Sequence, residues 1–135
     1  MTLDDLKDEL EKDLPISLTK MQSEAAENAV LYGKWSRYNA DLKRELIKLQ
    51  NGRKTELKKA LLYYTGRGDD VCMDVWDKTE LRTIIPAHKD VLTANASVEL
   101  TEAKIDLTRY AQESIKQRGF TIRAIIDLRK LEAGE

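Results

Sequence analysis

The chain has 135 residues, which is enough for one modest hydrophobic core but too short for a large catalytic cleft beside a separate regulatory domain, so we expect residues 1–135 to form a single domain. Charged residues make up 35% of the sequence and aromatic residues 6%, a balance typical of long solvated helices with narrow apolar stripes. The net charge of −1 hides an asymmetry, because residues 1–31 carry 3 basic and 8 acidic groups, residues 34–67 carry 10 and 3, and residues 68–135 carry 10 and 13.

The first predicted element is a short amphipathic helix within residues 1–16. Leu3, Leu6, Leu10 and Leu14 recur at helical spacing, and acidic residues follow Thr2, where a helix N-terminus favours negative charge. Pro15 then ends the segment.

A much longer basic helix is predicted over residues 17–65. We expect it to begin near Ser17 to Thr19, with Thr19 and Gln22 placed as a capping box, and to end at Thr65 and Gly66. Nine of thirteen positions in an alternating 4,3 series are apolar, which predicts a coiled-coil-like seam against a partner helix. The nine are Met21, Ala25, Tyr32, Trp35, Leu42, Leu46, Leu49, Ala60 and Tyr63, and the polar four are Asn28, Asn39, Arg53 and Glu56.

The period changes over residues 66–86, where a glycine-containing loop precedes two short β-prone runs, Val71 to Trp76 and Leu81 to Ile85. We therefore predict a small β-hairpin near residues 70–86. The acidic residues Asp69, Asp70, Asp74 and Asp77 lack the glycine and closing glutamate of a calcium loop. A solvated acidic turn is favoured over a metal site, and no metal ligands are assigned.

A third helix is predicted over residues 87–117, with Val91, Ala94, Val98, Ile105 and Ile115 on one stripe that packs back along the basic helix. Arg118 and Gly119 are expected to interrupt it before a C-terminal assembly segment, residues 118–135. The large apolar residues of that segment exceed what one small fold must bury, which favours self-association. They are Phe120, Ile122, Ile125, Ile126, Leu128 and Leu131. The fold class is thus mainly α, a long helical hairpin with short flanking elements.

Seven cations of the basic helix fall within an arc of roughly 160° on a helical wheel, opposite the stripe containing Trp35 and Leu42. They are Lys34, Arg37, Arg44, Lys48, Lys54, Lys58 and Lys59. An ordinary solvated face usually interleaves acids at i,i+4, and few are available here. A row of cations suits a phosphate backbone and carries no base code. Tyr63 and Tyr64, followed by Gly66, Arg67 and Gly68, could add base stacking and close backbone approach at one end of this candidate nucleic-acid site. Of these, Tyr64 and Arg67 are assigned to the site, and the core is the favoured place for Tyr63.

Catalytic chemistry finds little support in the sequence. His88 is the only histidine and lies at a predicted helix start, where a surface or capping role is the simpler interpretation. Cys72 is the only cysteine, and its simplest interpretation is a small half-buried hydrophobe. Phosphate-binding and dinucleotide-binding loops are absent, so no cofactor is expected. The chain start lacks the pattern of a signal peptide and no long apolar run exists, so neither secretion by that route nor a membrane span is expected.

Ordered blocks along nearly the whole chain resemble the UvsY family of recombination mediator proteins of T-even phages. The blocks are Leu31-Tyr32-Gly33-Lys34-Trp35, Leu57-Lys58, Tyr63-Tyr64-Thr65-Gly66-Arg67-Gly68-Asp69, Lys89-Asp90-Val91-Leu92 and Ile115-Lys116-Gln117-Arg118-Gly119-Phe120, followed by Asp127, Arg129 and Glu132-Ala133-Gly134.

This resemblance implies a non-enzymatic protein that binds and wraps single-stranded DNA as a homo-oligomeric ring, a hexamer or heptamer, in the cytoplasm of the infected bacterial host. It also implies contacts with the phage single-strand-binding protein and a UvsX-type recombinase, which the ring helps to load onto DNA. The family places two DNA-contacting basic residues in a Leu-Lys-Ala-Arg-Leu segment. Lys58 matches the first, whereas Ala60 stands where the family has the arginine, with Lys59 beside it about 100° away on the helix.

Two other classes of function compete with this hypothesis. A coiled-coil adaptor or assembly chaperone would bind only proteins, with its cations matching an acidic partner. A metal-dependent enzyme built on the acidic loop around residues 69–77 is a more remote alternative.

Overall fold

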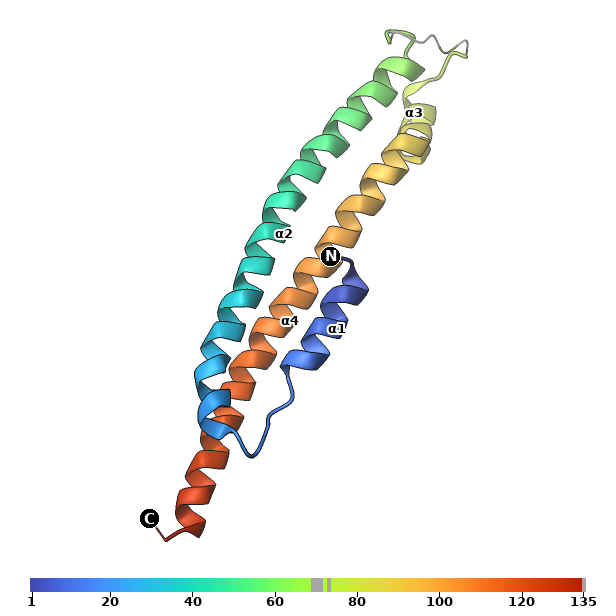
Figure 1. Cartoon of the computed structure of the whole chain (residues 1–135). Helices are drawn as coiled ribbons and strands as arrows, with labels where there is room; N and C mark the ends of the chain where they lie inside the picture. Colours follow the sequence, from blue (N-terminus) through green and yellow to red (C-terminus); the bar gives the residue numbers. More distant parts are fainter. Residues whose placement is uncertain (69–71, 73, 135) are drawn as a thin grey trace. The chain divides into compact units, whose positions relative to one another are not determined.

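The computed structural model describes residues 1–68, 72 and 74–134, and these form a mainly helical protein (Figure 1). The four helices are α1 (Leu3–Asp13), α2 (Met21–Tyr64), α3 (Lys78–Ala87) and α4 (Lys89–Glu132). They build two compact units: Met1–Leu42 with Ala103–Glu135, called unit 1, and Lys43–Glu102, called unit 2. In the described part of the chain no helix is both long enough and apolar enough to cross a membrane.

In unit 1, α1 packs against the first half of α2 and the middle of α4 (Figure 1). Its N-terminus is closed by a capping box in which the Thr2 hydroxyl accepts from the Asp5 backbone N–H, while the Asp5 carboxylate accepts from the Thr2 N–H. Leu6 and Leu10 are buried together with Trp35, Ala111 and Ile115. The predicted short amphipathic helix is confirmed, and the spacing of its leucines is the reason it packs here.

Two predictions about helix starts and breaks in unit 1 were wrong. Helix α2 begins at Met21 rather than at Ser17 to Thr19, and the Thr19 hydroxyl pairs with the Ser17 hydroxyl instead of capping the helix. Helix α4 runs unbroken through Arg118 and Gly119, so residues 118–132 continue the third helix instead of forming a separate one.

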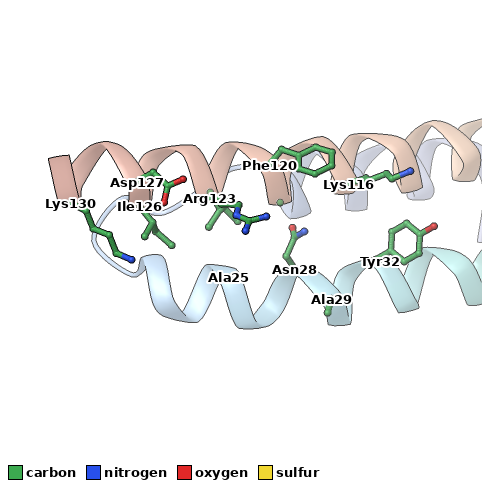
Figure 2. A pocket seen from close by; sticks show the side chains of 12 residues that line it. Ala25, Asn28, Ala29, Tyr32, Lys116, Phe120, Arg123, Ile126, Asp127 and Lys130 are labelled. Carbon is green, nitrogen blue, oxygen red and sulfur yellow. The ribbon is translucent and has the colours of Figure 1, made fainter. Parts of the chain in front are cut away.

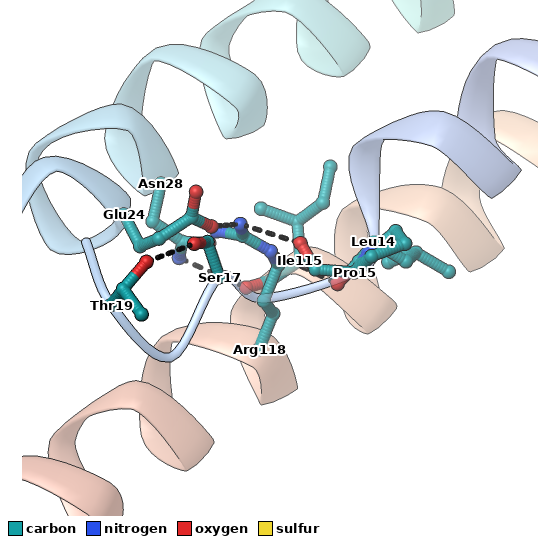
Figure 3. Close-up of polar contacts among 8 residues, drawn as sticks. All are labelled: Leu14, Pro15, Ser17, Thr19, Glu24, Asn28, Ile115 and Arg118. Carbon is teal, nitrogen blue, oxygen red and sulfur yellow. Dashed lines mark hydrogen bonds and ion pairs between the residues drawn. The ribbon is translucent and has the colours of Figure 1, made fainter. Parts of the chain in front are cut away.

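Both residues at the expected interruption have packing roles within unit 1, and the contacts of Arg118 are drawn in Figure 3. The buried Arg118 side chain donates to the Leu14 carbonyl (3.1 Å), the Pro15 carbonyl (3.1 Å) and Asn28 Oδ1 (2.9 Å), and it forms an ion pair with Glu24. A Cβ on residue 119 would lie 2.7 Å from Asn28 Nδ2, which donates to the Ile115 carbonyl at 3.0 Å. Gly119 thus leaves room for the Asn28 amide and does not break the helix.

In unit 2, α2 ends at Tyr64, one residue before the predicted end at Thr65, and Gly66 adopts a left-handed conformation with φ of 73° just beyond it. Ala60, Val91 and Val98 form the buried centre of this unit, in agreement with the predicted seam.

The predicted β-hairpin near residues 70–86 is wrong, because no strand occurs in the described residues and Lys78–Ala87 is helix α3. Asp77 caps this helix, with its Oδ1 accepting from the Glu80 backbone N–H at 2.8 Å. Leu81, Ile84 and Ile85 are its half-buried apolar residues, and their i, i+3, i+4 spacing is helical. Part of the first predicted strand, Val71 and Met73, lies outside the described residues, as do Asp69 and Asp70 of the acidic turn.

Candidate nucleic-acid interface

The part of α2 that belongs to unit 2 is strongly basic. Residues 43–64 carry seven lysines and arginines against two glutamates. We call the exposed cations that this part of α2 shares with the predicted cation row the basic face; they are Arg44, Lys48, Lys54, Lys58 and Lys59. The facing part of α4, residues 89–102, carries one lysine against three acidic residues. Positive charge in unit 2 is therefore concentrated on one of its two long helical segments.

Ala60 stands at the position where the resembling family has a DNA-contacting arginine. Ala60 is only 1% exposed and packs in the centre of unit 2, whereas Lys58 and Lys59 on either side of the seam point to solvent. Lys59 pairs with Glu56 at 3.6 Å, but its side chain remains 68% exposed, and ion pairs this exposed are weak. Lys59 therefore keeps a charge that an anion can reach.

Lys34 differs from the other predicted cations because its ammonium is already paired with carboxylates of α1. It forms a salt bridge with Asp13 and lies 3.5 Å from Glu9, and it also lies over the Trp35 ring. Burial acts against the charge of Lys34, but the hydrogen bond to Asp13 and the attraction of Asp13 and Glu9 outweigh it, so its pKa is raised. Lys34 thus joins α1 to α2 within unit 1, where Arg37 is exposed.

Arg53, which the helical wheel assigned to the apolar side of α2, lines an open groove in unit 2. The groove has a volume of about 460 Å³. Lys48, Gly52 and Lys59 line the α2 wall beside Arg53, and Thr93 and Ser97 lie on the α4 wall. Sequence reasoning missed Arg53 because a cation on the seam side looked like a defect, whereas in the structure that side is partly open.

Four rings form an aromatic cluster in unit 2, and they lie where α2 ends and α4 begins. The Tyr64 hydroxyl and His88 Nδ1 share a hydrogen bond of 3.0 Å. The Trp76 and Tyr64 rings meet edge-on, with their centroids 6.4 Å apart. The ring centroids of Tyr63 and Tyr64 are 5.0 Å apart, and the ring planes are inclined by 77°. His88 caps the end of α3 immediately before α4, in agreement with a capping role.

A cavity of about 490 Å³ adjoins this aromatic cluster. Its lining consists of Lys59, Leu62, Tyr63, Arg67, Gly68, His88 and Asp90. Tyr63 and Tyr64 are both half-buried. Tyr63, assigned from sequence to the core, borders the cavity, whereas Tyr64, assigned to the nucleic-acid site, is hydrogen-bonded to His88. The exposed Arg67 lies on the cavity wall as well.

The predicted assembly residues divide between the interior and the surface of unit 1. An open groove of about 840 Å³ lies between the first part of α2 and the end of α4, with Tyr32 and Phe120 on its walls and Ile126 directed toward α2 (Figure 2). Ile122 is only 2% exposed, and Ile125 and Ile126 are half-buried. Phe120, Leu128 and Leu131 are exposed, the last two by 54% and 73%. Among the predicted assembly residues, these three are the ones exposed to solvent.

The described residues contain no group of three or more His, Cys, Asp or Glu side chains placed to hold a metal ion. Cys72 is half-buried, in agreement with its interpretation from the sequence.

Known proteins resemble this chain along its whole length. Residues 9–135 match the profile of the family described as recombination, repair and ssDNA binding protein UvsY. The recombination protein uvsY of Enterobacteria phage T4 is 42% identical over 137 residues, covering 100% of both chains. Crystal structures of the bacteriophage T4 recombination mediator protein UvsY also match. One crystal lattice gives a TM-score of 0.91 at 41% identity, with 98% of each chain covered, and another gives 0.81 at 38% identity, with 98% of this chain and 99% of the other covered.

Proposed function

The chain belongs to the UvsY family of recombination, repair and single-stranded-DNA-binding proteins, and from this premise we propose that it is a non-catalytic recombination mediator. It binds single-stranded DNA through the basic face of unit 2 and acts as a homo-oligomeric ring. The ring promotes loading of a phage recombinase onto DNA covered by single-strand-binding protein. The concentration of exposed cations on residues 43–64 is the observation that carries this proposal.

Electrostatics support DNA binding by the basic face. Each phosphate neutralised by Lys48, Lys54 or Lys58 releases condensed counterions, so affinity falls as salt rises. The three side chains are exposed, so their ammonium groups are available to phosphates without unfolding any packed element. Contacts of this kind follow the strand without reading its sequence, as a mediator acting on any single-stranded stretch requires.

Self-association is supported by the apolar surface at the end of α4. Leu128 and Leu131 are exposed on the last turns, and the groove containing Phe120 and Ile126 lies beside them in unit 1 (Figure 2). Contiguous apolar surface of this kind marks interaction sites in water-exposed proteins. We infer a ring of six or seven copies, the assembly that the family resemblance implies.

Assembly and DNA binding reinforce each other in this proposal. One protomer holds a strand weakly, but linked protomers present their basic faces to the same strand at high effective concentration. A strand held along several protomers takes a path that loosens the single-strand-binding protein and offers a nucleus to a UvsX-type recombinase. The setting is the cytoplasm of an infected bacterial cell.

The DNA-binding claim is tested by titrating a labelled single-stranded oligonucleotide at several salt concentrations. Replacing Lys54 and Lys58 with alanine is expected to lower affinity and to flatten the log–log salt dependence by roughly 0.7 per lost phosphate contact. Replacing Lys7 and Lys12, two exposed lysines of α1, is the matched control, because it makes the same charge change in unit 1.

Equal slopes for the two double variants would remove the basic face from the site. No binding by the wild-type chain at low salt would instead favour a coiled-coil adaptor that binds only proteins.

The assembly claim is tested with Leu128→Ser combined with Leu131→Ser. Both side chains are exposed, so the protomer keeps its core, whereas truncation before Phe120 would also delete the buried Ile122. Sedimentation is expected to show smaller species than the wild type, and an unchanged mass would refute a role for these residues in assembly.

A further inference from the structure

We propose that the cavity beside the aromatic cluster of unit 2 is a nucleobase-stacking subsite, in which Tyr63 stacks on one base of a single strand. This inference rests on the proposed DNA binding and goes beyond it. Lys59 and Arg67 hold the phosphates that flank the stacked base. Tyr63 is thereby a DNA-contacting residue, whereas Tyr64 supports the site from behind.

The Tyr63 ring is held in place yet offers a surface to a flat ligand. The Tyr63 and Tyr64 ring planes are nearly perpendicular, at 77°. The His88 ring centroid lies 6.2 Å from that of Tyr63, and the two ring planes are inclined by 36°. Neither neighbour stacks parallel on Tyr63, and the ring borders the cavity. Tyr64 is fixed in turn by its hydrogen bond to His88, so the wall behind Tyr63 is braced by the fold.

The size of the cavity fits a base with part of its sugar and phosphate. A volume of about 490 Å³ lies within the range of small-molecule pockets, ~300–1,000 Å³. Every base has a π face, so stacking on tyrosine binds single strands without sequence preference. This property suits the weakly specific binding expected from the basic face.

Opposite charges lie on two sides of the cavity, with cations on the side proposed for the phosphates and a carboxylate on the side proposed for the base. Lys59 and Arg67 are exposed cations on its wall. Lys59 also lines the adjoining groove together with Lys48 and Arg53, so positive charge continues from the cavity along α2. Asp90 lies on the opposite, α4 side, 3.7 Å from His88 Nε2, where its carboxylate repels phosphate but accepts hydrogen bonds from base amino groups.

The decisive experiment compares two strands of equal length, one normal and one in which abasic sites replace the bases. The full-length chain is studied as wild type, Tyr63→Phe and Tyr63→Leu. Phenylalanine keeps the stacking surface and leucine keeps only apolar bulk. We expect Tyr63→Leu to weaken binding of the normal strand about fivefold or more while leaving the abasic strand unchanged, and Tyr63→Phe to match the wild type on both.

A strand carrying 2-aminopurine gives a second reading of the same contact. Its fluorescence is expected to be quenched by the wild type and by Tyr63→Phe, and much less by Tyr63→Leu. If Tyr63→Leu fails to fold by circular dichroism, photo-cross-linking of a 5-iodouracil strand to the wild-type chain decides, with Tyr63 as the expected adduct.

Three results would overturn the stacking subsite: equal losses for both strands in Tyr63→Leu, no loss for either strand, or cross-links confined to residues away from the cavity. In each case salt-dependent binding by the wild type would leave the proposed DNA-binding function intact. Failure of the wild type to bind any single strand at low salt would refute the proposed function and this inference together.

Discussion

Replacing Arg118 with methionine should destabilise unit 1 far more than removing a charge from the same helix usually does. Methionine keeps the length and apolar stem of arginine but loses the guanidinium. That group satisfies the carbonyls of Leu14 and Pro15, the Asn28 amide oxygen and the Glu24 carboxylate. All of these acceptors would lose their partner at once (Figure 3).

The magnitude follows from burial. The Arg118 side chain is 5% exposed and that of Glu24 is 19% exposed, so removal of the cation leaves a carboxylate largely shielded from water. Breaking a buried pair in this way costs about 3–5 kcal/mol, because the remaining charge is uncompensated. Since domains are stable by only about 5–15 kcal/mol, Arg118→Met should remove a large share of the free energy of unfolding.

Urea denaturation followed by circular dichroism measures this loss. Arg109→Met is the matched control, because Arg109 lies on the same helix within unit 1, has a side chain that is 62% exposed, and meets Asp106 only at 3.8 Å. That variant should cost about 0.5 kcal/mol or less. Combining Arg118→Met with Glu24→Gln should recover part of the loss, because the stranded carboxylate is then neutral. Equal stabilities for Arg118→Met and Arg109→Met would refute the reasoning.

Three smaller predictions concern stability and use the same denaturation assay. Gly33→Ala should stabilise the chain by roughly 0.5–1 kcal/mol, because a Cβ there meets open space. Gly119→Ala should destabilise the chain, because its Cβ would displace the Asn28 amide. Increased stability in both variants would contradict the close approach of Asn28 to Gly119. Thr2→Ala should cost about 1 kcal/mol through loss of the cap of α1, and no change would mean that the cap is dispensable. Lys34→Met should make the free energy of unfolding fall less steeply at alkaline pH. The pKa of Lys34 is raised above its ordinary 10.5, so its contribution to stability is complete below that pH and is lost as pH rises through the raised value. The same alkaline decrease in the free energy of unfolding for the variant and the wild type would contradict this ion pair.

The sequence predicted those parts of the fold in which local pattern and tertiary packing agree. Leucines at helical spacing behind Thr2 predicted α1, and the apolar stripe of the third helix contains Val91, Val98 and Ile115, all of which are buried. In each case the periodic residues face a partner helix, so period alone identifies the buried side.

The errors arose where one local signal was outweighed, either by a distant contact or by a second local signal. Gly119 resembles a helix break until the Asn28 side chain occupies the space of its missing Cβ. The run from Leu81 to Ile85 is rich in β-prone residues, but the Asp77 cap and the helical spacing of its apolar side chains make it part of α3.

The candidate site was predictable in its charge and less so in its detail. The cations of α2 were found from composition and a helical wheel, because exposed residues on one helix need no partner to be placed. Base stacking was considered for Tyr63 from the sequence, but the core was favoured. The open surfaces that Tyr63 and Arg53 border depend on where α4 leaves α2 uncovered, and one sequence does not contain that information.

Sedimentation of the wild-type chain with and without a single-stranded oligonucleotide tests the central claim most directly. The account predicts an oligomer whose mass is a multiple of the 15.5 kDa protomer and which carries the strand at low salt. A 15.5 kDa species that leaves the strand unbound in dilute buffer would contradict both the proposed assembly and the proposed DNA binding.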